Sequence, residues 1–283
     1  MINIDYFKFG IDKYLNNFES DKNSGLYEYH LIRKELEKID FEVKEGTLVV
    51  LNGLMSNKEM EFIENKIDAA HLKGAKTIYI VTDEIAFTNI DLMNKFDLVL
   101  HQAWKYNFDC IKCEQKYSYV PELFFTDKID IPMFQHNLVL FCGNSKDRED
   151  KIKMYLRNNC CNAGTFSLIK NEEKDERVEH SEYIKLQKMF KYSLMICRES
   201  YRECGWITAR LIEAIDNWSL PVFDIDYDIN KAYKIEDVCG YEEMYENAIL
   251  KKDTSRMWEL TVLRVKVKER RKLFAKQILE FCK

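Results

Sequence analysis

Short apolar runs alternate with amphipathic stretches along the first half of the chain. Residues 47–51 and 77–81 are almost wholly apolar and rich in β-branched side chains, which is typical of parallel strands covered on both faces. Hydrophobic periodicity predicts helices over residues 27–39 and 57–73. Residues 98–101 form the next strand-like run. Strands that alternate with helices in this way predict βαβ units and a parallel sheet.

A second series of the same kind begins after Pro132. Strands are predicted over residues 137–142, 165–169, 192–197 and 220–224, and helices over residues 148–158, 181–190 and 207–217. Pro132 and its charged neighbours make residues 127–132 the best candidate for a linker. We therefore expect an α/β protein with two similar lobes and a cleft between them.

The end of the chain has a helical pattern of its own. Residues 254–281 show the periodicity of one or two long helices with a basic outer face. The positions expected to be buried are Leu260, Leu263, Val267, Phe274, Ile278 and Phe281. The predicted division is thus a first lobe over residues 1–130, a second over 131–254, and a helical end over 255–283.

Composition supports a folded globular protein. Hydrophobic residues make up 46% and charged residues 32% of the chain, with only 9 Gly and 3 Pro, which excludes disordered and collagen-like classes. The first residues lack a secretory pattern, and no apolar run approaches the roughly 20 residues of a membrane helix. We expect a cytoplasmic protein with no membrane partner, and its nine cysteines to be mostly reduced and buried.

Charge is distributed unevenly along the chain. The net charge of −5 argues against a nucleic-acid partner, but residues 255–283 hold nine basic against three acidic residues. The candidates for a basic strip are Arg264, Lys266, Lys268, Arg270, Arg271 and Lys272. A solvated helix face is the alternative. Trp104 and Tyr106 could stack on a flipped base, or could simply pack in the core.

Candidate phosphate-binding residues follow the predicted strand 137–142. Gly143, Lys146 and Arg148 lie in a turn that opens a predicted helix, where backbone N–H groups and cations can hold a phosphate. An ordinary turn between strand and helix is the alternative. The chain has no GxxxxGK[ST], GxGxxG or GxSxG motif, which weakens ATPase, classical dinucleotide and serine-hydrolase hypotheses.

Further candidates carry acid and base chemistry. Arg210 and Glu213 are three residues apart on a predicted helix, so they can face one ligand or form a surface ion pair. Asp83 directly follows the strand 77–81, where a carboxylate can be a general base or a helix cap. Cys110 and Cys113 have zinc-like spacing, but no second CxxC or paired His follows, so we predict no metal site.

These segments, in their order and spacing, resemble the DNA β-glucosyltransferase family of T-even bacteriophages, which are two-lobed GT-B glycosyltransferases. Residues 207–213, Ile-Thr-Ala-Arg-Leu-Ile-Glu, and the acidic strand 222–228 are similar to the family's Ile-Thr-Leu-Arg-Val-Trp-Glu and its downstream strand. Residues 77–83 resemble a strand that ends in Phe-Thr-Asp. The glycine and arginine turn at residues 143–148 resembles the family's own, although Lys146 stands where the family has arginine.

The resemblance implies the roles of the candidate residues. Asp83 would be the general base, and Glu213 would bind the donor ribose. The donor diphosphate would be held by Gly143, Lys146, Arg148 and Arg210. The implied fold is GT-B, with two Rossmann-like lobes and a C-terminal helix that crosses back to the first lobe. Residues 1–130 would bind the acceptor and residues 131–254 the nucleotide-sugar.

The resemblance also implies a reaction. An inverting transferase would move a hexose, with UDP-glucose as the favoured donor, to the hydroxymethyl group of a modified pyrimidine in double-stranded DNA. Tentative DNA contacts are Trp104, Arg270, Arg271 and Lys272. Such an enzyme is expected to be a monomer in the infected bacterial cytoplasm, with a divalent metal not required. The alternatives are a GT-B enzyme acting on a surface glycan, protein or small metabolite, and a non-catalytic sugar-nucleotide or DNA-binding protein.

Overall fold

The chain divides into two compact units in the computed structural model. Unit 1 comprises residues 1–123 with 270–283, and unit 2 comprises residues 124–269. The structure describes residues 24–39, 47–52, 57–82, 89–104, 108–127, 129–144, 148, 150, 152, 165–170, 180–223 and 253–283. Within these residues no helix is long and apolar enough to cross a membrane.

Unit 1 contains a four-stranded parallel sheet. Its strands are β1 (Leu48–Asn52), β2 (Thr77–Val81), β3 (Leu98–His101) and β4 (Glu114–Tyr117), in the order β1-β2-β3-β4. The first three strands are those that the apolar runs predict. Each strand pairs with the next one along the chain, so the strand order follows the chain in one direction across the sheet.

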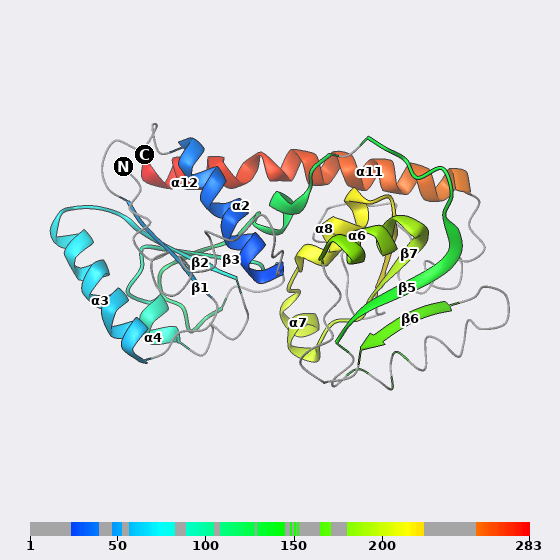
Figure 1. The fold of residues 1–283 in the computed structure, drawn as a ribbon. Helices are drawn as coiled ribbons and strands as arrows, with labels where there is room; N and C mark the ends of the chain where they lie inside the picture. The colour runs from blue at the N-terminus through cyan, green and yellow to red at the C-terminus, as the bar shows by residue number, and fades with distance from the viewer. Residues whose placement is uncertain are drawn as a thin grey trace. The chain divides into compact units, whose positions relative to one another are not determined.

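Helices cover both faces of this sheet, which explains its apolar strands. On one face, Ile78 and Ile80 pack in a core with α2 (Ser24–Ile39) and α12 (Leu273–Cys282). Tyr79 points to the opposite face, where its ring stacks on Phe96 at 5.0 Å between centroids. The helix α3 (Asn57–Leu72) packs against β1 and β2 and lies on the other side of the sheet from α2 (Figure 1).

Unit 1 also contains two described short elements. They are α4 (Ile90–Met93) and η4 (Pro121–Phe124), whose last residue belongs to unit 2. The C-terminal residues of the chain belong to unit 1, where Phe274 and Ile278 of α12 are fully buried. Arg270 is tied to the same unit by an ion pair between its Nε and Oε1 of the buried Glu122, at 2.9 Å.

Unit 2 contains a second four-stranded parallel sheet with a different order. Its strands are β5 (His136–Asn144), β6 (Thr165–Lys170), β7 (Phe190–Met195) and β8 (Leu220–Phe223), in the order β6-β5-β7-β8. The chain passes from β5 to β6 on one side and then returns to place β7 on the other side of β5. The direction of the connections therefore reverses between β5 and β7, and such a reversal is where parallel sheets bind ligands.

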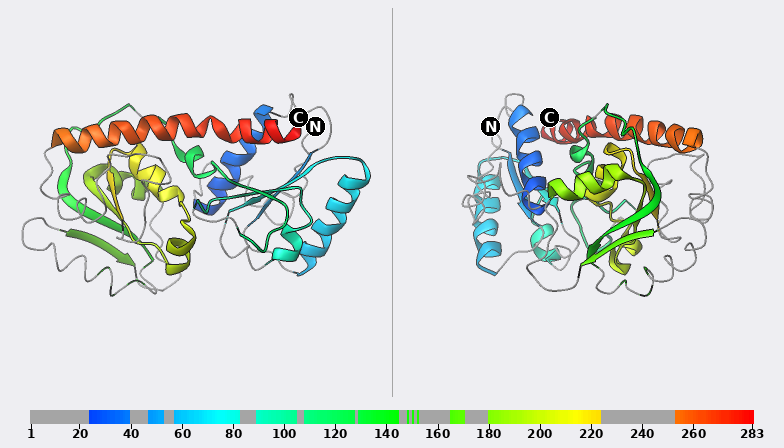
Figure 2. Two further views of the ribbon diagram at one scale, coloured as in Figure 1. Left: turned by 180° about the vertical axis from the view of Figure 1, so that it is seen from behind. Right: turned by 45° about the vertical axis from the view of Figure 1, so that its right-hand side comes forward.

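Four described helices belong wholly or mainly to unit 2. They are α6 (His180–Met189), α7 (Glu199–Cys204), α8 (Ala209–Asp216) and α11 (Asp253–Arg271), whose last two residues belong to unit 1. The helix α6 packs against β5 and β7, and α8 packs against β7 and β8; Figure 2 shows both helices beside the sheet in two views. All residues from Leu211 to Asp216 are buried, so α8 is a core helix and its position is set by packing.

Candidate functional site

Two arginines meet at the carboxyl ends of the central strands of unit 2. Nη1 of Arg148 donates a hydrogen bond to the carbonyl oxygen of Ile196, the residue after β7, at 2.5 Å. Nη1 of Arg210 donates to the carbonyl oxygen of Cys142 in β5 at 3.4 Å. The two contacts place both guanidinium groups where the strand order reverses.

The electrostatics of this pair favour an anionic ligand. The pKa of Arg148 is lowered, first by burial and next by the positive charge of Arg210. Two like charges held near each other repel, and this repulsion raises the free energy of the protein. A bound phosphate would remove this repulsion, and guanidinium groups bind phosphate oxygens through paired hydrogen bonds. The arrangement can therefore hold a ligand with two negative charges.

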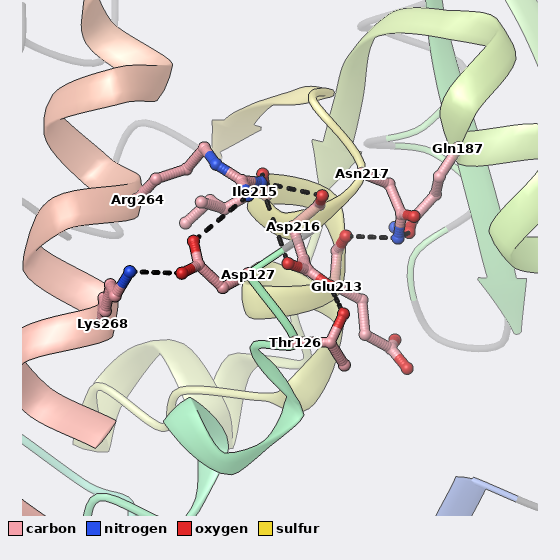
Figure 3. Close-up of polar contacts among 9 residues, drawn as sticks. All are labelled: Thr126, Asp127, Gln187, Glu213, Ile215, Asp216, Asn217, Arg264 and Lys268. Atoms are coloured by element: carbon pink, nitrogen blue, oxygen red, sulfur yellow. Dashed lines mark hydrogen bonds and ion pairs between the residues drawn. The ribbon is translucent and has the colours of Figure 1, made fainter. Parts of the chain in front are cut away.

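Glu213 lies on the same helix as Arg210, with a different exposure. Arg210 is exposed at the start of α8, whereas Glu213 is buried three residues later. The carbonyl oxygen of Glu213 accepts a hydrogen bond from Nδ2 of Asn217 at 2.7 Å, and Figure 3 shows its carboxylate extending away from that contact. The predicted helix is confirmed, and it presents one cation and one carboxylate from neighbouring turns.

Tyr183 is a further member of this group, which the sequence analysis missed. It lies on α6, and its hydroxyl accepts a hydrogen bond from Nε2 of Gln187 at 2.6 Å. The pKa of Tyr183 is raised, first by burial and next by the charge of Glu213, while Arg210 acts in the opposite direction. The hydroxyl is therefore neutral beside Glu213. An isolated tyrosine on a polar helix carries no sequence signal of this contact.

Other predicted site residues lie outside this group. Asp83 and Lys146 are outside the described residues, and of Gly143 the structure gives the backbone, within β5. Among the residues that the structure describes, no cluster of three or more His, Cys, Asp or Glu side chains could hold a metal ion. The donor-side residues that can be located are thus Arg148, Arg210 and Glu213.

The carboxyl end of β3 in unit 1 carries neutral polar groups. Burial lowers the pKa of His101 to about 4, so this side chain is uncharged at neutral pH. The next residue, Gln102, is buried and donates from Nε2 to Oε1 of Glu28 on α2 at 2.7 Å. Trp104 follows and is half-buried. This edge differs from that of unit 2 because its described groups offer hydrogen bonds with little positive charge.

The basic residues of the C-terminal helices have contacts within their own units. The guanidinium of Arg270 pairs with Glu122 and lies over the rings of Tyr117 and Tyr119, at 4.8 and 5.1 Å from their centroids. Arg271 lies 3.8 Å from a carboxylate oxygen of Glu35. Lys272 is exposed. Arg270 and Arg271 thus have acidic partners within unit 1, and Lys272 is the most exposed of the three.

No protein-family model matches the chain, and no curated protein is similar enough to be matched to it. The functional argument therefore depends on the residues themselves.

Proposed function

We propose that the chain is a UDP-sugar-dependent hexosyltransferase whose unit 2 binds the donor. The observation that carries this proposal is the pair Arg148 and Arg210 at the reversal of the parallel sheet. A nucleoside diphosphate carries two negative charges that can bind this pair and offset its repulsion, and the carboxylate of Glu213 can accept hydrogen bonds from a ribose. A GT-B arrangement, with the acceptor bound by unit 1, is part of the proposal.

The proposed reaction is a single displacement with inversion. The acceptor hydroxyl attacks the anomeric carbon of the sugar while the bond from that carbon to the UDP oxygen breaks. Asp83 takes the proton of the hydroxyl as the general base. Arg148 and Arg210 stabilise the negative charge that develops on the departing UDP. No step needs a redox change.

The proposed acceptor is the hydroxymethyl group of a modified pyrimidine in double-stranded phage DNA, with glucose as the transferred hexose. Support for this acceptor comes from the resemblance of residues 207–213 and 77–83 to the phage transferases. Trp104, next to the polar end of β3, is the aromatic side chain proposed to contact an extruded base. Lys272 is the exposed cation proposed to contact the phosphate backbone.

A second acceptor class is favoured by one specific observation. Arg264, Arg270 and Lys268 were candidates for a basic strip, but each is engaged in an ion pair with a carboxylate of its own unit. Fewer cations then remain to neutralise DNA phosphates. A GT-B enzyme acting on a glycan, protein or small metabolite would not need them.

Transfer from radiolabelled UDP-sugars tests both acceptor classes. The duplexes contain hydroxymethylcytosine or hydroxymethyluracil, and an unmodified duplex is the control. Label on a modified duplex alone supports the DNA proposal, and Asp83→Asn is expected to abolish it while UDP binding persists. An active Asp83→Asn protein would exclude this residue as the base. UDP binding with no label on any duplex would favour the second acceptor class, and absence of UDP binding would contradict both.

A further inference from the structure

The helix α8, which carries Arg210 and Glu213, ends in an unusual way. The N–H of Trp218 donates to the carbonyl oxygen of Ile215 at 3.3 Å, and the N–H of Ser219 donates to that of Ala214 at 3.0 Å. These two hydrogen bonds form the motif that most often ends a helix with a glycine in the left-handed conformation. Here the residue in that position is Trp218, with a φ of 63°.

A tryptophan in this conformation is unfavourable, because its Cβ crowds the backbone where glycine has none. Other contacts must therefore hold it in place. The ring of Trp218 lies under the guanidinium of Arg264, 4.3 Å from the ring centroid, and its carbonyl oxygen accepts hydrogen bonds from Arg256 at 3.0 Å and from Gln135 at 3.2 Å. The ring of Phe125 also lies near Arg264, at 4.9 Å.

Arg264 also binds the end of α8 directly. Its Nη1 donates to the carbonyl oxygens of Ile215 at 3.0 Å and of Asp216 at 2.8 Å (Figure 3). The last carbonyl groups of a helix lack partners within the helix and carry partial negative charge, so a cation there stabilises the helix end. The carboxylates of Asp127 and Asp216 lie 3.7 and 3.8 Å from the guanidinium and complete its surroundings.

Further hydrogen bonds connect the end of α8 to the candidate donor site. Asn217, next to Trp218, donates to the carbonyl oxygen of Glu213 and, at 3.2 Å, to Oε1 of Gln187. Gln187 in turn holds the hydroxyl of Tyr183. Because α8 has only eight residues, a shift of its last turn moves Glu213 within that turn and Arg210 one turn before it.

We propose that Arg264 and Trp218 are positioning residues, which fix the end of α8 and so hold Arg210 and Glu213 in the geometry that binds the donor nucleotide. The inference rests on the proposed function. Neither residue touches the donor in this account. Their effect passes through the backbone of α8, so it should change the affinity for UDP more than the rate of the chemical step.

The first test compares Arg264→Lys with Arg270→Lys. Both arginines lie on α11 with their guanidinium groups near two aromatic rings and beside a carboxylate, and the hydrogen bonds to the end of α8 described above are those of Arg264. Lysine keeps the charge and loses the planar fork that binds two carbonyl groups while stacking. We expect Arg264→Lys to weaken UDP binding, measured by calorimetry, on the order of tenfold, and Arg270→Lys to change it less than about twofold. Equal effects of the two variants would overturn the proposal.

A second test separates positioning from stability. Trp218→Gly and Trp218→Ala both remove the ring from Arg264, but only glycine suits the left-handed backbone. We expect the two variants to lose UDP affinity by a similar factor, although the glycine variant should have the higher melting temperature. If UDP affinity follows melting temperature instead, Trp218 has only a structural role and the proposal fails for it.

Amide hydrogen exchange tests the positioning role of Arg264 without UDP, and so separately from the proposed function. Arg264→Lys is expected to speed amide exchange in residues 213–217, whereas Arg270→Lys should leave it unchanged. If the unaltered protein binds no UDP, the proposed function fails, and exchange alone then decides whether Arg264 fixes α8. If UDP binds but exchange in residues 213–217 is the same in both variants, the positioning inference is wrong and the proposed function stands.

Discussion

The two parallel sheets have similar strands, but the side chains at the carboxyl ends of these strands differ. In unit 1 the described strands follow chain order, and the end of β3 carries the neutral His101 and the amide of Gln102. In unit 2 the order reverses at β5, and Arg148 and Arg210 meet there. A reversal sends successive connections to opposite sides of the sheet and leaves room for a ligand between them. Among the described residues, the reversal of strand order and the two arginines beside it are therefore both features of unit 2.

The arginines of the two units also differ in the charges that lie beside them. Arg270 in unit 1 faces the carboxylate of Glu122, so its charge is neutralised inside the protein. Arg148 in unit 2 donates to a backbone carbonyl and is opposed by Arg210. In the first arrangement the neighbouring charge is opposite and favours the guanidinium, whereas in the second it is of like sign and opposes it. The charge that lies beside a half-buried arginine therefore indicates whether the arginine has a structural role or is a candidate for ligand binding.

Breaking the ion pair of unit 1 should have the largest effect on stability. Arg270→Met leaves Glu122 buried without its cation, and removing one partner of a buried pair costs about 3–5 kcal/mol of unfolding free energy. Urea denaturation measures this loss. The double variant Glu122→Leu/Arg270→Met should lose less, because neither charge of this pair remains. A loss below about 1 kcal/mol in Arg270→Met would mean that this pair is no stronger than one on the surface, and the contrast between the units would disappear.

Breaking the arginine pair of unit 2 should mainly affect binding. Hydrogen bonds to a charged group contribute about 1.5–3 kcal/mol, so Arg148→Met should weaken UDP binding by roughly 10- to 150-fold. Its unfolding free energy should fall less than that of Arg270→Met, because the change removes a repulsive charge along with one hydrogen bond. Calorimetry and urea denaturation measure the two effects.

Arg202→Met is the matched control for this variant. Arg202 is also an arginine of unit 2, but it pairs with the exposed Glu199 on the surface of α7, at 3.0 Å. UDP affinity should stay unchanged in this variant. If Arg148→Met binds UDP as tightly as Arg202→Met does, then the two arginines at the reversal do not form the donor site.

Most of the fold follows from patterns that the sequence displays. The strands β2 and β3 begin and end where their apolar runs do, since burial on both faces demands an unbroken apolar run. The strand β4, Glu-Gln-Lys-Tyr, was not predicted. Its side chains are exposed or half-buried, so the hydrophobic signal is weak, and only pairing with β3 identifies it as a strand.

The candidate site was only partly predictable. The spacing of Arg210 and Glu213 on one helix is local and was recognised, whereas Tyr183 reaches them through tertiary packing that no spacing reveals. Arg264 was a candidate for an exposed basic strip, with a solvated helix face as the alternative, but it is 7% exposed. The spacing of the sequence could have predicted this burial. Arg264 lies four residues after Leu260 and three before Val267, on the same helix face, and both of these residues are buried as predicted. A charged residue within an apolar stripe indicates a buried ion pair.

The unfolding free energy should depend on pH through His101 at the end of β3, a neutral group that differs from the arginines of unit 2. Because the pKa of His101 falls from 6.5 to about 4 on folding, the unfolded chain binds the proton more strongly, and stability is lost as pH falls below about 6.5. From pH 7.5 to pH 5 this group should cost about 2 kcal/mol. Urea denaturation at both pH values should show this loss in the unaltered protein and not in His101→Asn. An equal pH dependence in both proteins would show that His101 is not buried as a neutral group.

The smallest expected effect concerns the exposed end of the basic helix. If unit 1 binds duplex DNA, Lys272→Gln should lower the slope of log affinity against log salt concentration by about 0.9, the value for one lost phosphate contact. The unfolding free energy should change by less than about 0.5 kcal/mol, because Lys272 lies on the surface. Lys73→Gln, at another exposed position of unit 1, is the control and should leave the slope unchanged. An equal slope in both variants would remove Lys272 from the DNA interface. Unit 1 would then have a neutral polar edge and no described cation committed to DNA, which would favour an uncharged acceptor.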